Sequence, residues 1–370
     1  MTMRRLIQLP TLLLILALLT SCGGDTAGRT VRQTRHMTPE NLAKRLNPNT
    51  QGLRSWTELG PALYESLKFV EKQPRTAPAF NQPGLKLSWG GLYQTLDLLL
   101  SLLPRLDREP ELLARLFVWK RIDSGALFTG YYEPEMEASF RPSPRYSWPI
   151  YAEPSWLNDG DPGYTREQID YNGALKGKGL ELAWVRDPVD LFFLHVQGSG
   201  RLRFPDGETS CVLYAGTNGH PYFAVGRELV ERGYAAPEDM SMQKIREILS
   251  RDPRLIREIL SLNRKYIFFR LAERGPFGAS GALLTPMVSA AVDRNYIPMG
   301  AVMAVEADLP DPNNKSRALR GLILAQDTGT MQNKHVDLFC GAGEKAAYTA
   351  GRMRGRAKIN ILVSRAALGR

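Results

Sequence analysis

The hydrophobic positions between residues 90 and 117 follow a helical period. Leucines at 92, 96, 99, 100 and 103 fall on one stripe of a helix, because side chains three and four positions apart share a face. Pro104 is expected to interrupt this stripe, since proline disrupts a helix interior, and the same period resumes over 112–117. The first portion of the chain is therefore predicted to be mainly helical.

From Phe128 onward the pattern changes to short apolar and aromatic runs separated by Gly, Pro and Asp. Such runs predict the strands of a barrel or sandwich. In this region we expect strands at 148–151, 182–185, 191–196 and 212–214, followed by amphipathic helices near 224–231 and 242–262. A second largely β stretch is expected from 266, with strands near 301–306, 321–326 and 336–339.

The N-terminus has the pattern of an export signal. Arg4 and Arg5 precede an apolar run at 12–19 that is too short to span a bilayer as a helix. The following Leu19-Thr20-Ser21-Cys22 resembles the lipobox of bacterial lipoproteins, which are cut before the cysteine and acylated on it. We therefore predict a signal peptide at 1–21, lipidation of Cys22 and a tether at 22–36. Because Gly23 follows the cysteine, the resemblance implies an outer-membrane lipoprotein facing the periplasm.

Composition and charge narrow the class of protein. With 43% hydrophobic and 23% charged residues, the 370-residue chain is globular, which excludes coiled-coil, collagen-like and disordered classes. Its formal charge of +10 favours an anionic partner, but export argues against nucleic acid. The basic positions 352, 354, 356 and 358 are interpreted as a solvated face or as contacts to carboxylates of a polymeric substrate.

Several familiar motifs are absent or incomplete. The four histidines form no HExxH and the sequence has no CxxC, which argues against zinc. His195 lies in an apolar run, where we interpret it as a hydrogen-bonded core residue. Ser199 lacks the GxSxG elbow, because Gln197 stands where the first glycine would be. Residues 341–346 fit GxGxxA but lack the acidic residue of a dinucleotide site, so we predict a tight turn and a helix start there.

Two cysteines, Cys211 and Cys340, remain after the lipidation site. An oxidising compartment permits a disulfide between them, but small buried apolar residues explain them equally well. The pairing therefore stays open.

Three C-terminal aspartates are the remaining candidates for chemistry: Asp293, Asp327 and Asp337. Asp327 ends an apolar run before Thr-Gly, and Asp337 lies among Val, Leu and Phe. An aspartate in such surroundings either caps backbone donors or has a raised pKa. Taken one at a time, each aspartate is better explained as a structural residue, because Asp at a strand end is ordinary turn chemistry.

Taken together, these motifs resemble the membrane-bound lytic murein transglycosylase A family, whose C-terminal part is called the three-aspartate domain. The resemblance rests on FTGYYEP (128–134), VQGSGR (196–201), YAGTNGHPY (214–222), YIFF (266–269), GALLTP (281–286), the segment 292–300, DTG (327–329) and VDLF (336–339). It implies a mainly β fold with helices: a double-psi β-barrel catalytic domain formed by 37–133 and 266–370. A second β-barrel domain, 134–265, is implied to be inserted in it, with glycan strands bound in the groove between the two.

The implied activity is that of a peptidoglycan lytic exotransglycosylase, a lyase that leaves 1,6-anhydromuramyl ends. Asp337 corresponds to the acid of the family, with Asp327 and Asp293 tuning and supporting it. The implied substrate-binding residues are Thr129, Tyr131, Gln197, Ser199, Asn218 and Tyr222, whose hydroxyl, amide and aromatic groups suit sugars. No metal or organic cofactor is implied, and the implied partners are glycan strands, the outer membrane through the lipid anchor, and cell-wall synthesis complexes.

The segment 330–335 departs from the family pattern, because it is one residue shorter and lacks two expected glycines. This departure keeps a second hypothesis open, a peptidoglycan-binding lipoprotein without activity. A third is an ordinary hydrolase that uses water and a second acid such as Glu133 or Glu181.

Overall fold

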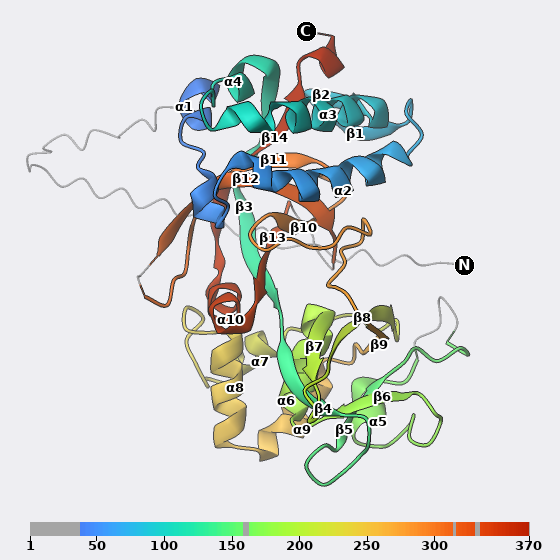
Figure 1. The fold of residues 1–370 in the computed structure, drawn as a ribbon. Helices are drawn as coiled ribbons and strands as arrows, with labels where there is room; N and C mark the ends of the chain where they lie inside the picture. Colours follow the sequence, from blue (N-terminus) through green and yellow to red (C-terminus); the bar gives the residue numbers. More distant parts are fainter. Residues whose placement is uncertain (1–37, 158–162, 314–315, 330–333, 370) are drawn as a thin grey trace, which may run out of the picture. The chain divides into compact units, whose positions relative to one another are not determined.

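The computed structural model describes residues 38–157, 163–313, 316–329 and 334–369, and only the backbone of 123–125. The predicted signal peptide, Cys22, the tether and positions 330–333 of the atypical loop lie outside the described residues. Figure 1 shows two β-structures and the long strand β3 (Phe117–Glu133), which runs from one to the other. Among the described residues, no helix combines the length and the apolar character that crossing a bilayer requires.

The first β-structure is a closed barrel of six strands in the order β10-β12-β11-β14-β3-β13. Strands β10 and β12 are parallel, as are β13 and β3, and the other neighbours are antiparallel. With β3, the barrel contains β10 (Ser289–Val292), β11 (Val302–Leu309), β12 (Arg317–Asp327), β13 (Val336–Ala342) and β14 (Arg354–Ser364). The strands predicted near 301–306, 321–326 and 336–339 are confirmed as parts of β11, β12 and β13.

Helices from the N-terminal portion pack against the barrel. This portion contains α1 (Pro39–Ala43), η1 (Pro48–Gln51), η2 (Trp56–Leu59), α2 (Gly60–Glu71), the hairpin β1 (Pro78–Gln82) and β2 (Leu85–Ser88), α3 (Trp89–Leu106) and α4 (Leu112–Leu116). The predicted leucine stripe lies on α3, where positions 92, 96, 99 and 103 are buried. Pro104 does not interrupt the stripe as predicted, because it falls in the last turn of a helix that continues to Leu106.

The second β-structure is a mixed sheet of six strands in the order β5-β6-β4-β7-β8-β9. Its strands are β4 (Glu135–Ser139), β5 (Trp148–Tyr151), β6 (Glu181–Val185), β7 (Ser199–Arg203), β8 (Thr209–Thr217) and β9 (Ile267–Ala272). A single bridge between Ala152 and Phe269 brings its two edges together. Strand β9 was expected after the boundary at 265, with the barrel, but it pairs with β8 in this sheet.

Six further helices and a terminal 3-10 turn complete the described fold: α5 (Arg166–Asp170), α6 (Pro188–Gln197), α7 (Val225–Glu231), α8 (Met242–Arg251), α9 (Arg254–Leu262), α10 (Gly343–Arg352) and η3 (Ala366–Leu368). The strand predicted at 191–196 is wrong, because this run lies in α6. Asp187 caps the helix by accepting from the Val189 N–H at 2.7 Å, Pro188 fills its first turn, and Gly198 ends it with a φ of 77°. The turn and helix start predicted at 341–346 are confirmed, with positive φ at Gly341 and Gly343.

A buried glutamine, Gln326 of β12, connects the barrel to α2. Its Nε2 donates to the Ala62 carbonyl at 2.7 Å and to the Ser66 hydroxyl at 2.9 Å, and its Oε1 accepts from the Ser289 hydroxyl at 2.6 Å. The side chain is 0% exposed. Because water cannot reach these three partners, the amide is the group that satisfies them.

Replacing Gln326 by leucine is expected to lower the free energy of unfolding by about 2–4 kcal/mol, since it leaves these polar groups buried without this partner. Differential scanning calorimetry checks the change. Ser66→Ala is the matched control and is expected to cost about 1 kcal/mol, because it removes only one of the bonds. Equal stability of Gln326→Leu and the unmodified protein would contradict the role given to this network.

Candidate active site

Two of the three candidate aspartates lie on one row of paired residues across the barrel. In strand order the row runs Asp327 of β12, Ala291 of β10, Asp337 of β13 and Thr129 of β3. Adjacent strands are about 4.8 Å apart, so one intervening strand places the two aspartate backbones roughly 10 Å apart. The two carboxyl groups therefore belong to one site without being direct neighbours in the sheet.

The carboxyl group of Asp337 has the properties of an acid that works near neutral pH. Its Oδ1 accepts a hydrogen bond from the Thr129 hydroxyl at 2.6 Å. Burial raises the pKa of Asp337 to about 6, the Thr129 bond opposes this shift, and the negative charge of Asp327 adds to it. The side chain is nevertheless only half-buried. It can therefore hold a proton while part of it is accessible.

The apolar surroundings of Asp337 differ from those expected. Val336 and Leu338, which flank it in sequence, are fully buried in the barrel core. Because successive residues of a strand point to opposite faces, these two point away from the carboxyl group. Phe339 lies on the same face as Asp337, with its ring centroid 5.3 Å from that of Tyr131. Phe339, two positions from Asp337, and Tyr131 on the neighbouring strand β3 thus contribute to the burial that raises the pKa of Asp337.

Asp327 is a hydrogen-bond acceptor for three groups. Its Oδ1 accepts from the N–H groups of Ala279 at 2.9 Å and Thr328 at 2.8 Å, and its Oδ2 accepts from the Tyr131 hydroxyl at 2.9 Å. Burial raises the pKa of Asp327, and the three hydrogen bonds offset part of that shift. This carboxylate holds the segment around residue 279 and the Tyr131 ring in place beside Asp337.

Asp293 lies just beyond β10 and forms a local turn. It is buried, and its Oδ1 accepts from the Asn295 N–H at 3.0 Å. Its carbonyl accepts from the N–H groups of Tyr296 and Ile297. Asp293 therefore stabilises a turn at the end of β10, two positions past the row that contains the other two aspartates.

Of the six expected substrate-binding residues, Thr129 lies on the row of the two aspartates, and Tyr131 lies two positions farther along β3. Gln197, the last residue of α6, accepts from the Tyr132 N–H at 3.0 Å through Oε1, and Ser199 begins β7. Gln197 therefore attaches the second sheet region to β3. Tyr222 is 46% exposed.

The side-chain amide of Asn218 is hydrogen-bonded to the backbone of other segments of the protein. The side chain is 1% exposed, and Nδ2 donates to the carbonyls of Tyr164 and Arg264, each at 2.9 Å. Its Oδ1 accepts from the Tyr266 N–H at 2.8 Å. Asn218 thus organises the backbone around it, a role that its position in the TNGHPY motif did not predict.

His335 is a neighbour of the acid that the sequence did not single out. Its Nε2 lies 2.6 Å from the Thr129 hydroxyl oxygen, which also bonds to Asp337. Burial lowers the pKa of His335, so the ring is neutral at neutral pH. The available signal was its position in the sequence, two residues before Asp337.

His195, Cys211 and Cys340 are buried within the protein. His195 is buried and its Nδ1 lies 2.8 Å from Nη1 of Arg166, which confirms the interpretation as a hydrogen-bonded core residue. Cys211 and Cys340 are both buried and free in the structure. Among the described residues, no three His, Cys, Asp or Glu side chains are grouped closely enough to hold a metal ion.

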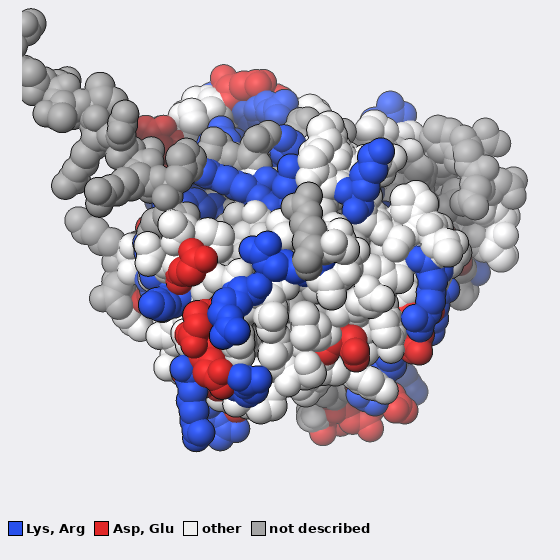
Figure 2. Space-filling model, turned by 90° about the horizontal axis from the view of Figure 1, so that it is seen from above, with Lys and Arg blue, Asp and Glu red and all other residues white. Residues whose placement is uncertain are grey.

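The basic cluster near the C-terminus is a solvated strand face. Positions 354, 356 and 358 of β14 are exposed and alternate with buried residues from position 357 onward. Lys358 lies 3.9 Å from Glu306, and the Arg352 guanidinium lies over the Tyr348 ring. On the face drawn in Figure 2, basic and acidic side chains are interspersed.

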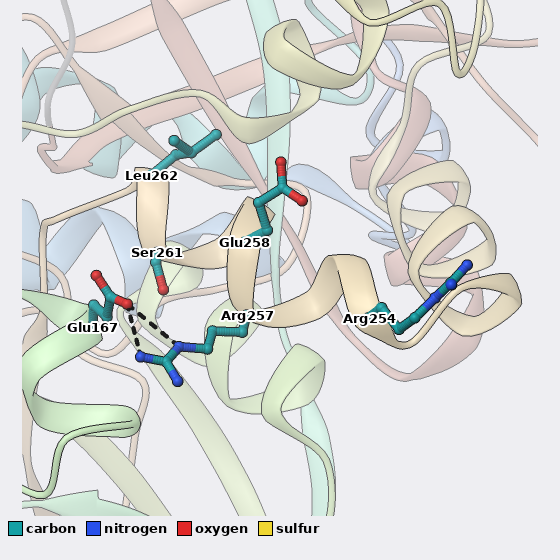
Figure 3. Close-up of a pocket in the computed structure, with 6 residues that line it drawn as sticks. All are labelled: Glu167, Arg254, Arg257, Glu258, Ser261 and Leu262. Atoms are coloured by element: carbon teal, nitrogen blue, oxygen red, sulfur yellow. Dashed lines mark hydrogen bonds and ion pairs between the residues drawn. The ribbon is translucent and has the colours of Figure 1, made fainter.

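A surface hollow of about 470 Å³ lies on α5 and α9, outside the acidic row. Figure 3 shows the residues that line it: Glu167, Arg254, Arg257, Glu258, Ser261 and Leu262. Its charges are neutralised locally, because Arg257 pairs with Glu167 at 2.9 Å, Arg254 with Asp252 at 2.8 Å, and Glu258 with Arg232. The hollow therefore offers no uncompensated charge for catalysis or anion binding.

Gly278 sets the position of the backbone that donates to Asp327. A methyl group at this position would lie 2.3 Å from the Gln326 carbonyl oxygen and 2.8 Å from Leu284. Gly278→Ala is therefore expected to displace the Ala279 N–H and to lower, about three- to tenfold, the rate of the glycan cleavage that the sequence resemblance implies. Steady-state kinetics measure this loss. Gly355→Ala, where a methyl group meets open space, should keep full activity, and equal rates for the two variants would contradict the account.

Comparisons with known proteins identify two matching family models. The model described as the MltA specific insert domain matches residues 127–270, and that of the 3D domain matches residues 288–363. Membrane-bound lytic murein transglycosylase A of Vibrio cholerae is 37% identical over 231 residues, which are 61% of this chain and 62% of the relative. The protein of the same name from Escherichia coli K12 is 36% identical over 230 residues, 60% of this chain and 62% of the relative. The matched part of the chain thus spans less than two thirds of these relatives.

Solved structures are similar over most of the chain. The crystal structure of a membrane-bound lytic murein transglycosylase from Agrobacterium tumefaciens has a TM-score of 0.72 and 32% identity, covering 88% of this chain and 96% of that one. E. coli MltA with bound chitohexaose has a TM-score of 0.70 and 28% identity, covering 83% of this chain and 90% of that one. Both the barrel and the second sheet therefore have counterparts in solved structures of this kind.

Proposed function

Because the chain belongs to the membrane-bound lytic murein transglycosylase A family, with an MltA insert and a 3D domain, we propose that it cleaves peptidoglycan glycan strands as a lytic transglycosylase. The observation that carries the proposal is the single half-buried carboxyl group of Asp337, whose pKa is raised to about 6. A relative of known structure binds chitohexaose, an oligosaccharide, which supports a glycan as substrate.

The proposed reaction breaks the β-1,4 bond between N-acetylmuramic acid and N-acetylglucosamine. Protonated Asp337 gives its proton to the glycosidic oxygen as the C1–O bond breaks. The C6 hydroxyl of the muramyl residue attacks C1, and the Asp337 carboxylate takes the proton of that hydroxyl. The products are a new N-acetylglucosamine hydroxyl and a 1,6-anhydromuramyl end, and Asp337 regains its proton.

The surroundings of Asp327 favour this one-carboxyl mechanism over ordinary hydrolysis. Glycosidases that use water generally need a second carboxylate as base or nucleophile. The oxygens of Asp327 accept from the N–H groups of Ala279 and Thr328 and from the Tyr131 hydroxyl, and its backbone is roughly 10 Å from that of Asp337. A carboxylate committed in this way is poorly placed to activate water, whereas an intramolecular hydroxyl needs no second carboxylate.

The finer description of the fold belongs to the same proposal. We assign the closed barrel as a double-psi β-barrel, which its mixture of parallel and antiparallel neighbours supports. The inserted β domain, expected at 134–265, is proposed to extend to 272, because β9 pairs with β8. Glycan is proposed to bind between the two domains.

Substrate contacts are proposed for Thr129 and Tyr131 beside the acid, and for Gln197, Ser199 and Tyr222 farther along the glycan. Tyr222 offers an exposed aromatic face of the kind that packs on sugar rings. Asn218 is proposed to shape the 214–222 segment rather than to bind sugar, because its amide is fully engaged. Asp293 is proposed to support the site through the turn after β10.

Membrane attachment is proposed through Cys22, after removal of residues 1–21, with the protein on the outer membrane facing the periplasm. The names of the relatives describe them as membrane-bound, which supports attachment. The proposed partners are peptidoglycan, the outer membrane and cell-wall synthesis complexes.

A digestion of purified sacculi tests the function. The form that begins at Gly23 is incubated with sacculi, and the soluble products are separated and weighed by mass spectrometry. Anhydromuramyl products, each lighter by one water than a hydrolysis product, are expected. Binding without soluble products would instead establish a non-catalytic peptidoglycan-binding protein, and hydrated reducing ends would establish a hydrolase.

A further inference from the structure

His335, Thr129 and Asp337 form a chain of two short hydrogen bonds. The Thr129 hydroxyl oxygen lies 2.6 Å from His335 Nε2 and 2.6 Å from Asp337 Oδ1. His335 immediately precedes β13, and Asp337 is the second residue of that strand. Thr129 is the residue paired with Asp337 on β3. The Thr129 hydroxyl thus bridges the His335 ring and the Asp337 carboxyl group.

Counting hydrogens fixes the direction of this chain. A threonine hydroxyl has one hydrogen to donate, and an ionised carboxylate can only accept. When Asp337 is ionised, Thr129 must donate to Oδ1, and His335 must therefore donate to Thr129 through a hydrogen on Nε2. The same arrangement persists when the carboxyl group carries its proton on Oδ2.

The geometry assigns His335 as a positioning residue of the proposed reaction: through Thr129 it keeps Oδ1 of Asp337 an acceptor and reserves Oδ2 for the proton that is transferred to the glycosidic oxygen. This inference rests on the proposed function. Nothing in the family match or in the names of relatives assigns a role to this histidine.

A neutral imidazole suits this role better than a charged one. A cationic ring next to Thr129 would stabilise the ionised form of Asp337 and so weaken the acid. Burial lowers the pKa of His335 and keeps the ring neutral. The other titratable groups that act on Asp337 or are affected by it are Asp327 of β12, the Tyr131 hydroxyl of β3 and the Cys340 thiol of its own strand. Lys334, next to His335 in sequence, lies over the Tyr296 ring at 5.5 Å.

Two substitutions separate the hydrogen-bonding role from a packing role. His335→Leu keeps an apolar side chain of moderate size and removes the donor, whereas His335→Gln keeps an N–H donor. For His335→Leu we expect kcat about tenfold lower, KM within about twofold, and the alkaline limb of the pH–rate profile about 0.5 unit higher. The limb rises because a Thr129 hydroxyl that no longer accepts a hydrogen bond donates more weakly to the carboxylate.

His335→Gln is expected to regain most of the kcat and the unmodified limb, and thermal unfolding confirms that both variants fold. The inference is overturned if His335→Leu matches the unmodified protein in kcat and limb. It is also overturned if both variants lose kcat equally without any displacement of the limb, since that pattern indicates packing alone. These results are interpreted only when the unmodified protein yields anhydromuramyl ends, because absence of those ends refutes the proposed function instead.

Discussion

Asp337→Asn is expected to lower kcat for glycan cleavage at least about 1,000-fold. The reason is that one group is proposed to act twice, first as the acid and then as the base, and each role is commonly worth about 10²–10⁴. Asparagine has the shape of aspartate and its Oδ1 can still accept from the Thr129 hydroxyl, whose bond is 2.6 Å long. Release of soluble muropeptides from sacculi measures the rate, and thermal unfolding verifies the fold.

Asp308→Asn is the matched control for this substitution. Its carboxylate is 67% exposed at the end of β11, so the same chemical change there should leave the rate unaltered. If Asp337→Asn kept more than a tenth of the unmodified rate, the acid would have to be sought elsewhere. Glu133 would be examined first, because its pKa is raised by burial.

Asp327→Asn is expected to lower the rate at neutral pH about tenfold and to move the alkaline limb to lower pH. The reaction needs protonated Asp337, so activity falls as pH rises through its pKa of about 6. The negative charge of Asp327 raises that pKa, and a neutral side chain removes the contribution. The pKa of Asp337 therefore falls, and the loss of activity begins at a lower pH. A pH–rate profile of kcat/KM measures the displacement.

Tyr131→Phe is the control for this charge effect. It removes the 2.9 Å hydrogen bond to Oδ2 of Asp327 but keeps the negative charge, so the limb should stay in place even if KM rises. The predicted downward displacement is opposite in sign to that expected for His335→Leu. An unchanged limb in Asp327→Asn would show that its charge does not act on Asp337.

Local patterns predicted much of the secondary structure. The leucine period placed α3, because a buried stripe that is sustained over about three turns is typical of a helix and not of a strand. The run at 191–196 was assigned to a strand because a short apolar segment fits either structure. The sequence signal that would have indicated a helix was the pair of residues that cap it, Asp187 and Gly198.

Pairing between distant strands could not be derived from local patterns. Asp327 and Asp337 were identified by motif, but their place on one row depends on the short strand β10 between β12 and β13. Likewise, the backbone donor at Ala279 reaches Asp327 from a segment 48 positions away. Hydrogen bonds of this kind leave no periodic signal in the sequence. The bonds that hold the Asp327 carboxylate and those that engage the Asn218 amide were therefore not predicted.

The oxygen isotope content of the new glycan ends tests the central claim most directly. Sacculi are digested in water enriched in ¹⁸O, and the soluble products are analysed by mass spectrometry. The oxygens of Asp327 accept hydrogen bonds from the protein, and Asp337 is the one proposed acid, so we predict that the muramyl C6 hydroxyl is the nucleophile. In that case the new muramyl ends contain no solvent oxygen. One ¹⁸O atom at C1 of each new end would show that water attacks, and would contradict the account.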